Sequence, residues 1–202
     1  MNTLYLKTLL GNTDMYLIDL IQKGYFDELK KIADVGCGSG RNIWLLNSLG
    51  HEIVAFDKDP SYVETMRLKL NLEALEKVDC RVGELGQIGE LTEKFDFVIC
   101  NAVLHFATDL NHFKKMFTEL VGLLERDGIL FIRMVTSHVF NSILAPFNEQ
   151  KKLPDGSTRF VVDQQWLMEV LIPSLNLEFV EEFKTVNVND KRTMSTLVLK
   201  TK

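Results

Sequence analysis

The feature that most constrains the fold is a regular alternation of short apolar runs with longer amphipathic stretches. The stretch 110–124 places apolar residues on one helical face up to Gly128, as expected for a helix packed on a sheet. Strands that alternate with helices form parallel sheets covered on both faces and joined by right-handed crossovers. The sequence therefore predicts a doubly wound α/β fold with a mostly parallel sheet. Five runs have the length and apolar character of its buried strands, namely 31–35, 52–56, 78–82, 95–101 and 129–135.

The last part of the sequence departs from this alternation. Residues 177–188 and 193–201 are two strand-like runs, and only the four residues from Asn189 to Arg192 separate them. A link of that length cannot hold a crossover helix, so the two strands should pair as an antiparallel hairpin. The expected sheet is therefore parallel for most of its width and antiparallel at its close.

The length of the chain favours one domain. With 202 residues, of which 46% are apolar, the chain can bury a continuous core, so we expect a single domain over 1–202. Within 1–29, the run from 15 to 26 has helical spacing and predicts a leading helix. Residues 136–173 form an irregular insertion, in which Pro154-Asp155-Gly156 predicts a turn and Asp163 is placed to cap a helix.

Composition narrows the possible partners. A formal charge of −5 without a basic run offers little attraction for a phosphate backbone, so we expect no nucleic-acid partner and favour small molecules. No apolar run approaches the roughly 20 residues of a membrane span, and 1–10 lack a signal-peptide pattern, so we expect a cytoplasmic protein without a membrane partner. Three cysteines without CxxC spacing argue against a disulfide framework and against a metal site. Nothing in the sequence indicates the oligomeric state.

A glycine-rich loop follows the first predicted strand, where residues 34–42 read Asp-Val-Gly-Cys-Gly-Ser-Gly-Arg-Asn. Ligands of open α/β sheets bind outside the carboxyl ends of the strands, and glycine lets the backbone approach a ligand closely. Asp57 ends the second strand 17 positions after Gly40, near the spacing at which dinucleotide folds place an acid on the ribose hydroxyls. Together the two signals predict a cofactor that contains a ribose, and both NAD and S-adenosylmethionine (SAM) fit them.

Two features favour SAM over NAD. The loop has the spacing GxGxG rather than GxGxxG, so the third glycine is displaced from the position that suits a pyrophosphate. Asp34 would lie poorly beside a diphosphate, whereas a carboxylate suits the cationic amino group of a methionine moiety. The less favoured alternative, an NAD(P)-dependent oxidoreductase, would need a hydride-transfer set such as Tyr-x-x-x-Lys. No tyrosine of the chain has a lysine four positions later.

Residues 32–42 resemble motif I of the class I SAM-dependent methyltransferases, with Asp34 and the three glycines on its pattern. The resemblance continues at Gly83-Glu84-Leu85, which matches the family's adenine site, and around the fourth and fifth strands. It implies a sheet of seven strands in the order 3-2-1-4-5-7-6. Within the family, residues 34–42 are similar to those of tellurite-resistance and related small-molecule methyltransferases. The sequence departs from the pattern at Glu84, where Asp is commoner, and at 126–128, which lack the usual Pro-Gly-Gly.

The resemblance implies that the protein is a SAM-dependent methyltransferase acting on a small-molecule acceptor. It also implies that Asp57 binds the ribose and that Glu84 accepts from the adenine amino group. A SAM-binding module without catalysis remains an alternative. The expected cofactor-binding residues are Asp34, Gly36, Cys37, Gly38, Gly40, Asn42, Asp57, Lys58, Glu84, Leu85, Asn101 and Ala102.

Methyl transfer from a sulfonium is an in-line displacement, in which the protein mainly aligns the reactants and excludes water. His105, after the fourth strand, is the candidate catalytic residue because it could accept a proton; alternatively, its ring only packs against the cofactor. Family members build their acceptor pocket in the irregular insertion. The expected substrate-binding residues are Arg133, His138, Phe140 and Arg159, whereas the spacing of Trp166 favours core packing.

Overall fold

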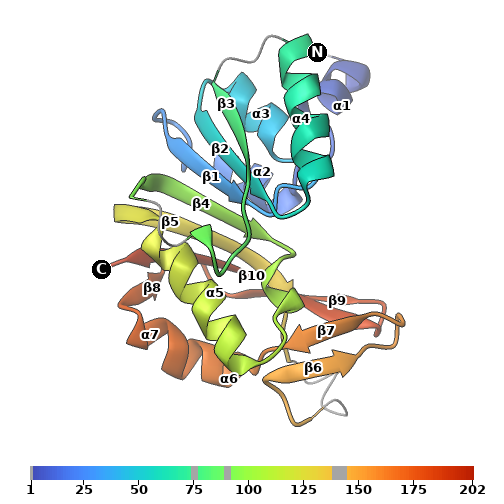
Figure 1. The fold of residues 1–202 in the computed structure, drawn as a ribbon, viewed down its shortest axis with the longest axis vertical. Helices are drawn as coiled ribbons and strands as arrows, with labels where there is room; N and C mark the ends of the chain where they lie inside the picture. Colours follow the sequence, from blue (N-terminus) through green and yellow to red (C-terminus); the bar gives the residue numbers. More distant parts are fainter. Residues whose placement is uncertain (1, 74–76, 89–91, 138–144) are drawn as a thin grey trace. The chain divides into compact units, whose positions relative to one another are not determined.

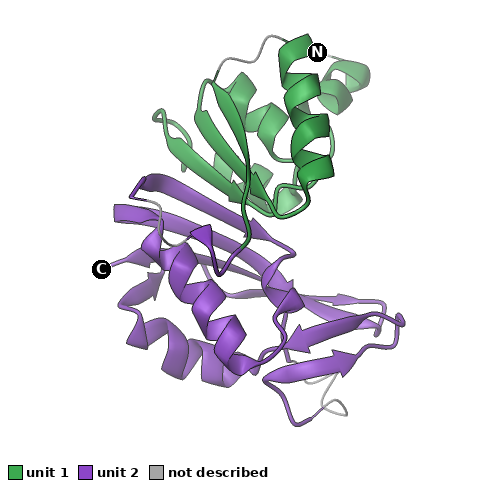
Figure 2. Ribbon diagram, viewed as in Figure 1, with its two compact units in different colours: residues 1–84 green, residues 85–202 purple. Residues whose placement is uncertain are grey.

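The computed structural model describes residues 2–73, 77–88, 92–137 and 145–202. They form two compact units, Met1–Glu84 and Leu85–Lys202, which have different colours in Figure 2. Each unit contains part of the α/β fold and its own buried residues. Among the helices described, none has the length and apolar character that crossing a membrane requires.

Unit 1 (Met1–Glu84) is built on three parallel strands in the order β3-β2-β1 (Figure 1). Asp34 is paired with Ala55 in the register of β1 and β2. The predicted strands and their order 3-2-1 are confirmed. The elements are α1 (Thr3–Leu10), α2 (Met15–Gln22), β1 (Lys31–Val35), α3 (Ile43–Ser48), β2 (Glu52–Asp57), α4 (Pro60–Leu72) and β3 (Val78–Val82).

Capping residues explain where the helices of unit 1 begin. Asp59 accepts a hydrogen bond from Ser61 N at 2.8 Å, and Pro60 is the first residue of α4. The helix therefore begins with the N-cap that the sequence predicts. Asp14 caps α2 in the same way, accepting from Tyr16 N at 3.0 Å. Helix α1 was not predicted, because it buries none of its residues and lacks the apolar stripe by which a helix is found.

Unit 2 (Leu85–Lys202) combines a parallel pair of strands with antiparallel ones (Figure 1). β4 (Phe95–Asn101) and β5 (Leu124–Val135) are parallel, and β10 (Arg192–Thr201) runs antiparallel to β5. Its neighbours β8 (Leu177–Phe179) and β9 (Lys184–Val188) pair antiparallel with β10. The order β4-β5-β10-β8 confirms the predicted order 4-5-7-6, and the α/β fold class is confirmed with it.

The helices of unit 2 pack on this sheet around a cluster of phenylalanines. Phe113 of helix α5 stacks on Phe160 of strand β7 with ring centroids 5.0 Å apart, and both side chains are fully buried. Helix α5 therefore fixes β7 in place. The elements not yet named are η2 (Leu104–Phe106), α5 (Leu110–Gly122), β6 (Glu149–Lys152), β7 (Thr158–Val161), α6 (Gln164–Trp166), η4 (Leu167–Leu171) and α7 (Ile172–Ser174).

The tail and the insertion differ from the sequence prediction in two respects. The run 177–188 is two strands rather than one, because β8 pairs with one end of the longer strand β10 and β9 pairs with the other end. The irregular insertion contains an antiparallel pair, β6 and β7, whose turn includes Gly156 at a φ of 85°. The predicted turn at Pro154-Asp155-Gly156 is confirmed. Its flanking strands were missed because β6 is entirely polar and lacks apolar alternation.

Candidate functional site

The glycine-rich loop leaves β1 at Val35 and returns to the sheet through its backbone. Gly36 N and Cys37 N both donate to Phe56 O, at 2.8 and 2.9 Å, so the start of the loop is fixed to the end of β2. A Cβ atom at Gly40, where φ is 80°, would lie 2.7 Å from Met66 Sδ, whereas nothing lies within 4 Å of a Cβ placed at Gly38. The backbone is therefore packed at Gly40 and open at Gly38.

Asp57 connects this loop to the turn after β2. One carboxylate oxygen accepts from Gly38 N at 2.8 Å and the other accepts from Asp59 N at 3.0 Å. The residue is 9% exposed, and each oxygen of a carboxylate can accept a further hydrogen bond. Asp57 is thus oriented by the backbone and still able to accept from a ligand.

Asp34 is a buried carboxyl group of unit 1 with one oxygen atom that is unpartnered within the described residues. It is 2% exposed, and its Oδ2 atom has no hydrogen-bond partner among the residues that the structure describes. Burial raises the pKa of Asp34 from 3.8 to about 7; nearby Arg41 acts to lower this pKa, and Asp57 acts to raise it. An orphaned buried acceptor is costly, which points to a donor supplied from outside the chain.

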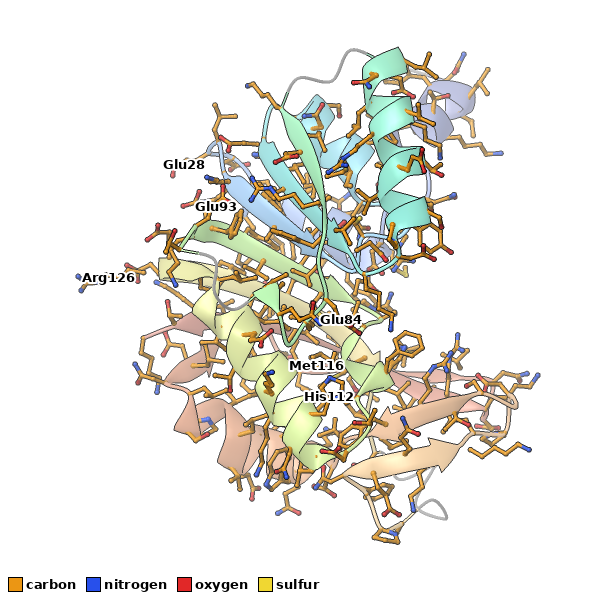
Figure 3. All side chains as sticks on the ribbon, viewed as in Figure 1. Glu28, Glu84, Glu93, His112, Met116 and Arg126 are labelled. Atoms are coloured by element: carbon orange, nitrogen blue, oxygen red, sulfur yellow. The ribbon has the colours of Figure 1, made fainter. Side chains whose placement is uncertain are left out.

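Four other predicted cofactor residues of unit 1 make internal contacts. Asn42 is buried and its Oδ1 atom accepts from Asp14 N at 3.1 Å, so its amide holds the start of α2. Lys58 Nζ lies 3.4 Å from Oε1 of Glu84, the last residue of unit 1, which is labelled in Figure 3. Cys37 is buried, and burial raises its pKa well above the ordinary range, so it is no nucleophile.

Unit 2 places the remaining predicted cofactor residues near the carboxyl end of β4. Asn101 is paired in register with Arg133 of β5, and Ala102 N donates to Arg133 O at 2.8 Å. Ala102 has a φ of 65°, a left-handed conformation that is uncommon for residues other than glycine and often found at functional sites. Leu85, by contrast, is a buried apolar residue.

His105 lies in η2, directly after β4. It is 6% exposed, and its Nδ1 atom has no hydrogen-bond partner within the described part of the chain. Its ring lies 4.8 Å from that of Phe106, between centroids. Burial, together with the smaller effect of the charges of Arg159 and Arg192, lowers the pKa of His105 from 6.5 to about 4. His105 is therefore neutral at pH 7.

Two arginines from distant parts of the sequence lie near His105. Arg159 of β7 stands with its Cζ atom 4.7 Å from the ring centroid of Phe106. Arg192, the first residue of β10, places Nη1 3.0 Å from Asp155 Oδ2. Sequence reasoning missed Arg192 because it treated 189–192 only as a link. The usable signal was topological: a strand antiparallel to β5 must begin where β5 ends.

The structure describes two of the four predicted substrate residues. Arg133 and Arg159 both belong to unit 2 and are half-buried, whereas His138 and Phe140 lie outside the described residues. Trp166 is half-buried with Lys114 Nζ 5.5 Å from its ring. Trp166 is not part of the buried core, so the core-packing interpretation is not confirmed.

Comparison with known proteins adds the family. The profile of a family described as "Methyltransferase domain" matches residues 33–132, which include the glycine-rich loop, β2 to β4 and parts of β1 and β5. This match confirms the resemblance to the class I SAM-dependent methyltransferases over residues 33–132. The chain is 32% identical over 123 residues to the malonyl-[acyl-carrier protein] O-methyltransferase of Acetivibrio thermocellus, covering 60% of this chain and 40% of that enzyme. It spans 40% to 51% of the first curated relatives that it matches.

Solved structures of the family share the fold. Magnesium protoporphyrin IX methyltransferase from Synechocystis PCC 6803, with bound S-adenosylhomocysteine (SAH), aligns with a TM-score of 0.72 at 16% identity, covering 100% of this chain and 89% of that chain. TehB from Haemophilus influenzae aligns with a TM-score of 0.66 at 18% identity, covering 91% and 62%. At such identities the alignments show the common fold alone.

Proposed function

We propose that this protein transfers a methyl group from SAM to a small-molecule acceptor. The observation that carries the proposal is the orphaned Oδ2 atom of buried Asp34, close to a loop whose backbone is open at Gly38. The ammonium group of a methionine moiety would supply the missing donor and the opposite charge. A pyrophosphate would instead bring negative charge to this carboxylate, which disfavours NAD.

The chain supplies further groups for the rest of the cofactor. Asp57 would accept from the ribose hydroxyls with the lone pairs that Gly38 N and Asp59 N leave unused. Glu84 would accept from the adenine amino group, and its side chain is 45% exposed and able to do so. The proposed contacts from unit 2 are Leu85, Asn101 and Ala102. Asn42 is less suited, because its amide oxygen already accepts from Asp14 N.

We propose that both units act as one methyltransferase domain over 1–202. The profile match at residues 33–132 supports this, because it extends from unit 1 into unit 2. The proposed cofactor residues also come from both units. The glycine-rich loop would hold the cofactor, and the residues after β4 and β5 would hold the acceptor.

SAM, when bound, supplies an activated methyl group on a sulfonium, so the residues of the chain mainly hold, align and dehydrate the reactants. His105 is a candidate for accepting a proton from the acceptor through Nδ1. Its pKa of about 4 makes it a weak base at pH 7, and its protonated form would lie near two arginine charges. The structure therefore favours a positioning contact for His105 over proton removal.

Calorimetric titration of cofactor-stripped protein with SAM, SAH and NADH tests the proposal. We expect micromolar binding of both adenosyl ligands and no heat from NADH. The Asp57→Ala variant should bind SAM more weakly by about 1–3 kcal/mol, the scale of a lost charge-assisted pair of hydrogen bonds. NADH binding alone would overturn the proposal. SAM binding without methyl transfer to any member of an acceptor panel would instead indicate a SAM-binding module.

A further inference from the structure

We propose that Arg159 and Arg192 form an anion-binding site in unit 2, and that the methyl acceptor is a small organic acid whose carboxylate is bound there. The inference rests on the proposed function and names the acceptor class for it. It is carried by two guanidinium groups near a buried histidine that has an orphaned nitrogen. All three residues lie in one compact unit.

The strand topology brings these residues to one edge of the sheet. η2, which carries His105, follows the carboxyl end of β4, and β5 ends at Val135. β10 runs in the opposite direction and starts at Arg192, with Met194 paired to Val135. The start of β10 therefore lies at the edge where β4 and β5 end, which is where open α/β sheets bind their ligands.

Arg159 is held at this edge by the β6–β7 pair. Gln150 Nε2 of β6 donates to Ala107 O at 3.0 Å, which fastens the pair to the residue after η2. The neighbour of Arg159 in β7, Phe160, is locked by its stacking on Phe113. The guanidinium lies over the ring of Phe106, which is 52% exposed. A rigid backbone and an exposed aromatic platform thus position a cation for a ligand.

The internal contacts of the two arginines leave donors unused. Arg159 Nη1 donates to Thr158 O at 2.7 Å, and no carboxylate within the described residues pairs with this arginine. Asp155 contacts Nη1 of Arg192, while Nε of Arg192 has no partner among the described residues. A guanidinium has five N–H donors in a planar fork. Asp155 therefore orients Arg192 without using its whole binding capacity.

Other charges nearby do not cancel the site. Lys151, paired with Arg159 in register, contacts Glu149, so that lysine and that glutamate neutralise each other. His105 is neutral, so it adds no charge to the site and contributes only its Nδ1 atom, which is unpartnered in the described part of the chain. Asp155 balances one of the two arginines, which leaves one net positive charge. A carboxylate matches this charge, and the guanidinium fork matches its two oxygens.

The test measures binding of defined acids to the full chain saturated with SAH. Calorimetry would compare malonate, succinate, citrate and inorganic phosphate, and would compare succinate with succinamide as the uncharged control. We expect at least one carboxylate to bind and its uncharged analogue not to bind. The Arg159→Gln and Arg192→Gln variants should each weaken that binding tenfold or more. Arg126→Gln is the matched control because Arg126, labelled in Figure 3, lies at the start of β5, whereas the proposed site lies where β5 ends.

A second variant and a second ligand keep the outcomes distinct. Arg192→Lys should retain the contact with Asp155 and most of the stability, but should still weaken carboxylate binding because it lacks the planar fork. The inference is overturned if no carboxylate binds, if the Arg159→Gln variant binds the carboxylate as tightly as the natural protein, or if phosphate binds more tightly than the carboxylates. SAM is titrated into each variant in parallel. If SAM binds and the acids do not, only the inference fails; if SAM itself does not bind, the proposed function fails.

Discussion

At the scale of single residues, Asp34 concentrates the chemistry of unit 1. The sequence could predict it, because an acid two positions before the first glycine of the loop is visible as a pattern. Its burial and its raised pKa could not be predicted, because they depend on how β1 is covered. The same carboxyl group should therefore control both cofactor binding and stability, in opposite directions with pH.

Cofactor affinity should rise with pH as Asp34 ionises. The pKa of this carboxyl is about 7, so below that pH most molecules must lose a proton before an ammonium group can pair with it. Calorimetry with SAH between pH 5.5 and 7.5 should show affinity rising by up to about tenfold per pH unit, levelling near neutrality. The Asp34→Asn variant should bind weakly with no such slope. A flat profile for the natural protein would exclude Asp34 from the site.

The stability of the unliganded protein should show the opposite trend. The folded-state pKa of about 7 lies above the ordinary value of 3.8, so the folded protein binds more protons between these values. The stabilisation is complete below about pH 4 and is lost as pH rises to about 7, with an upper limit of about 4 kcal/mol. Urea unfolding at pH 5 and pH 8 measures it. Asp34→Asn should remove this part of the pH dependence, and an unchanged slope would contradict the assignment.

At the scale of elements, the loop between β1 and α3 shows how one motif serves two purposes. At Gly40, where φ is positive, a Cβ would meet the thioether end of Met66 of α4, whereas no atom lies within 4 Å of a Cβ at Gly38. The two glycines look equivalent in the sequence. Only the contacts of α4 reveal that one is structural and that the other faces the proposed ligand.

Paired substitutions should separate these roles. Gly40→Ala should lower the free energy of unfolding by the roughly 1–2 kcal/mol of left-handed alanine plus a further cost for displacing the thioether end of Met66. Gly38→Ala should show only that smaller loss of stability but a large loss of SAM affinity. Thermal denaturation and calorimetry on both variants provide the comparison. If Gly38→Ala lowers the free energy of SAM binding by no more than it lowers the free energy of unfolding, no ligand lies against Gly38.

Strands were easier to predict than the parts that surround them. β1, β3 and β4 have the bounds that the sequence predicts. β1 and β4 are largely buried, as apolar strands covered on both faces are, whereas β3 buries only Cys80. The β6–β7 pair was missed because Glu149–Lys152 has no apolar residue to mark it as a strand. Arg192 was missed for a related reason, since its role depends on which strand lies beside β5 and not on local sequence.

At the scale of the whole molecule, the proposed functions are divided between the units. Unit 1 contains the loop and the acids Asp34 and Asp57, and unit 2 contains His105 and the arginines. The sequence predicted the order of strands within each unit, because the motifs lie in the same succession as in the family that the chain resembles. It could not predict two compact units, which are defined by contacts rather than by composition.

The antiparallel strand β10 has a consequence for how the protein folds. Thr136 and Ser195, whose hydroxyls hydrogen-bond where β5 ends beside β10, are 59 positions apart in the chain. Closing so long a loop is entropically unfavourable, and non-local pairing slows folding. The sheet of unit 1 joins strands that are nearer in sequence. In pulse-labelled hydrogen exchange during refolding, the amides of β1 and β2 should become protected before those of β10; simultaneous protection would show that the strands of both units form in one cooperative step.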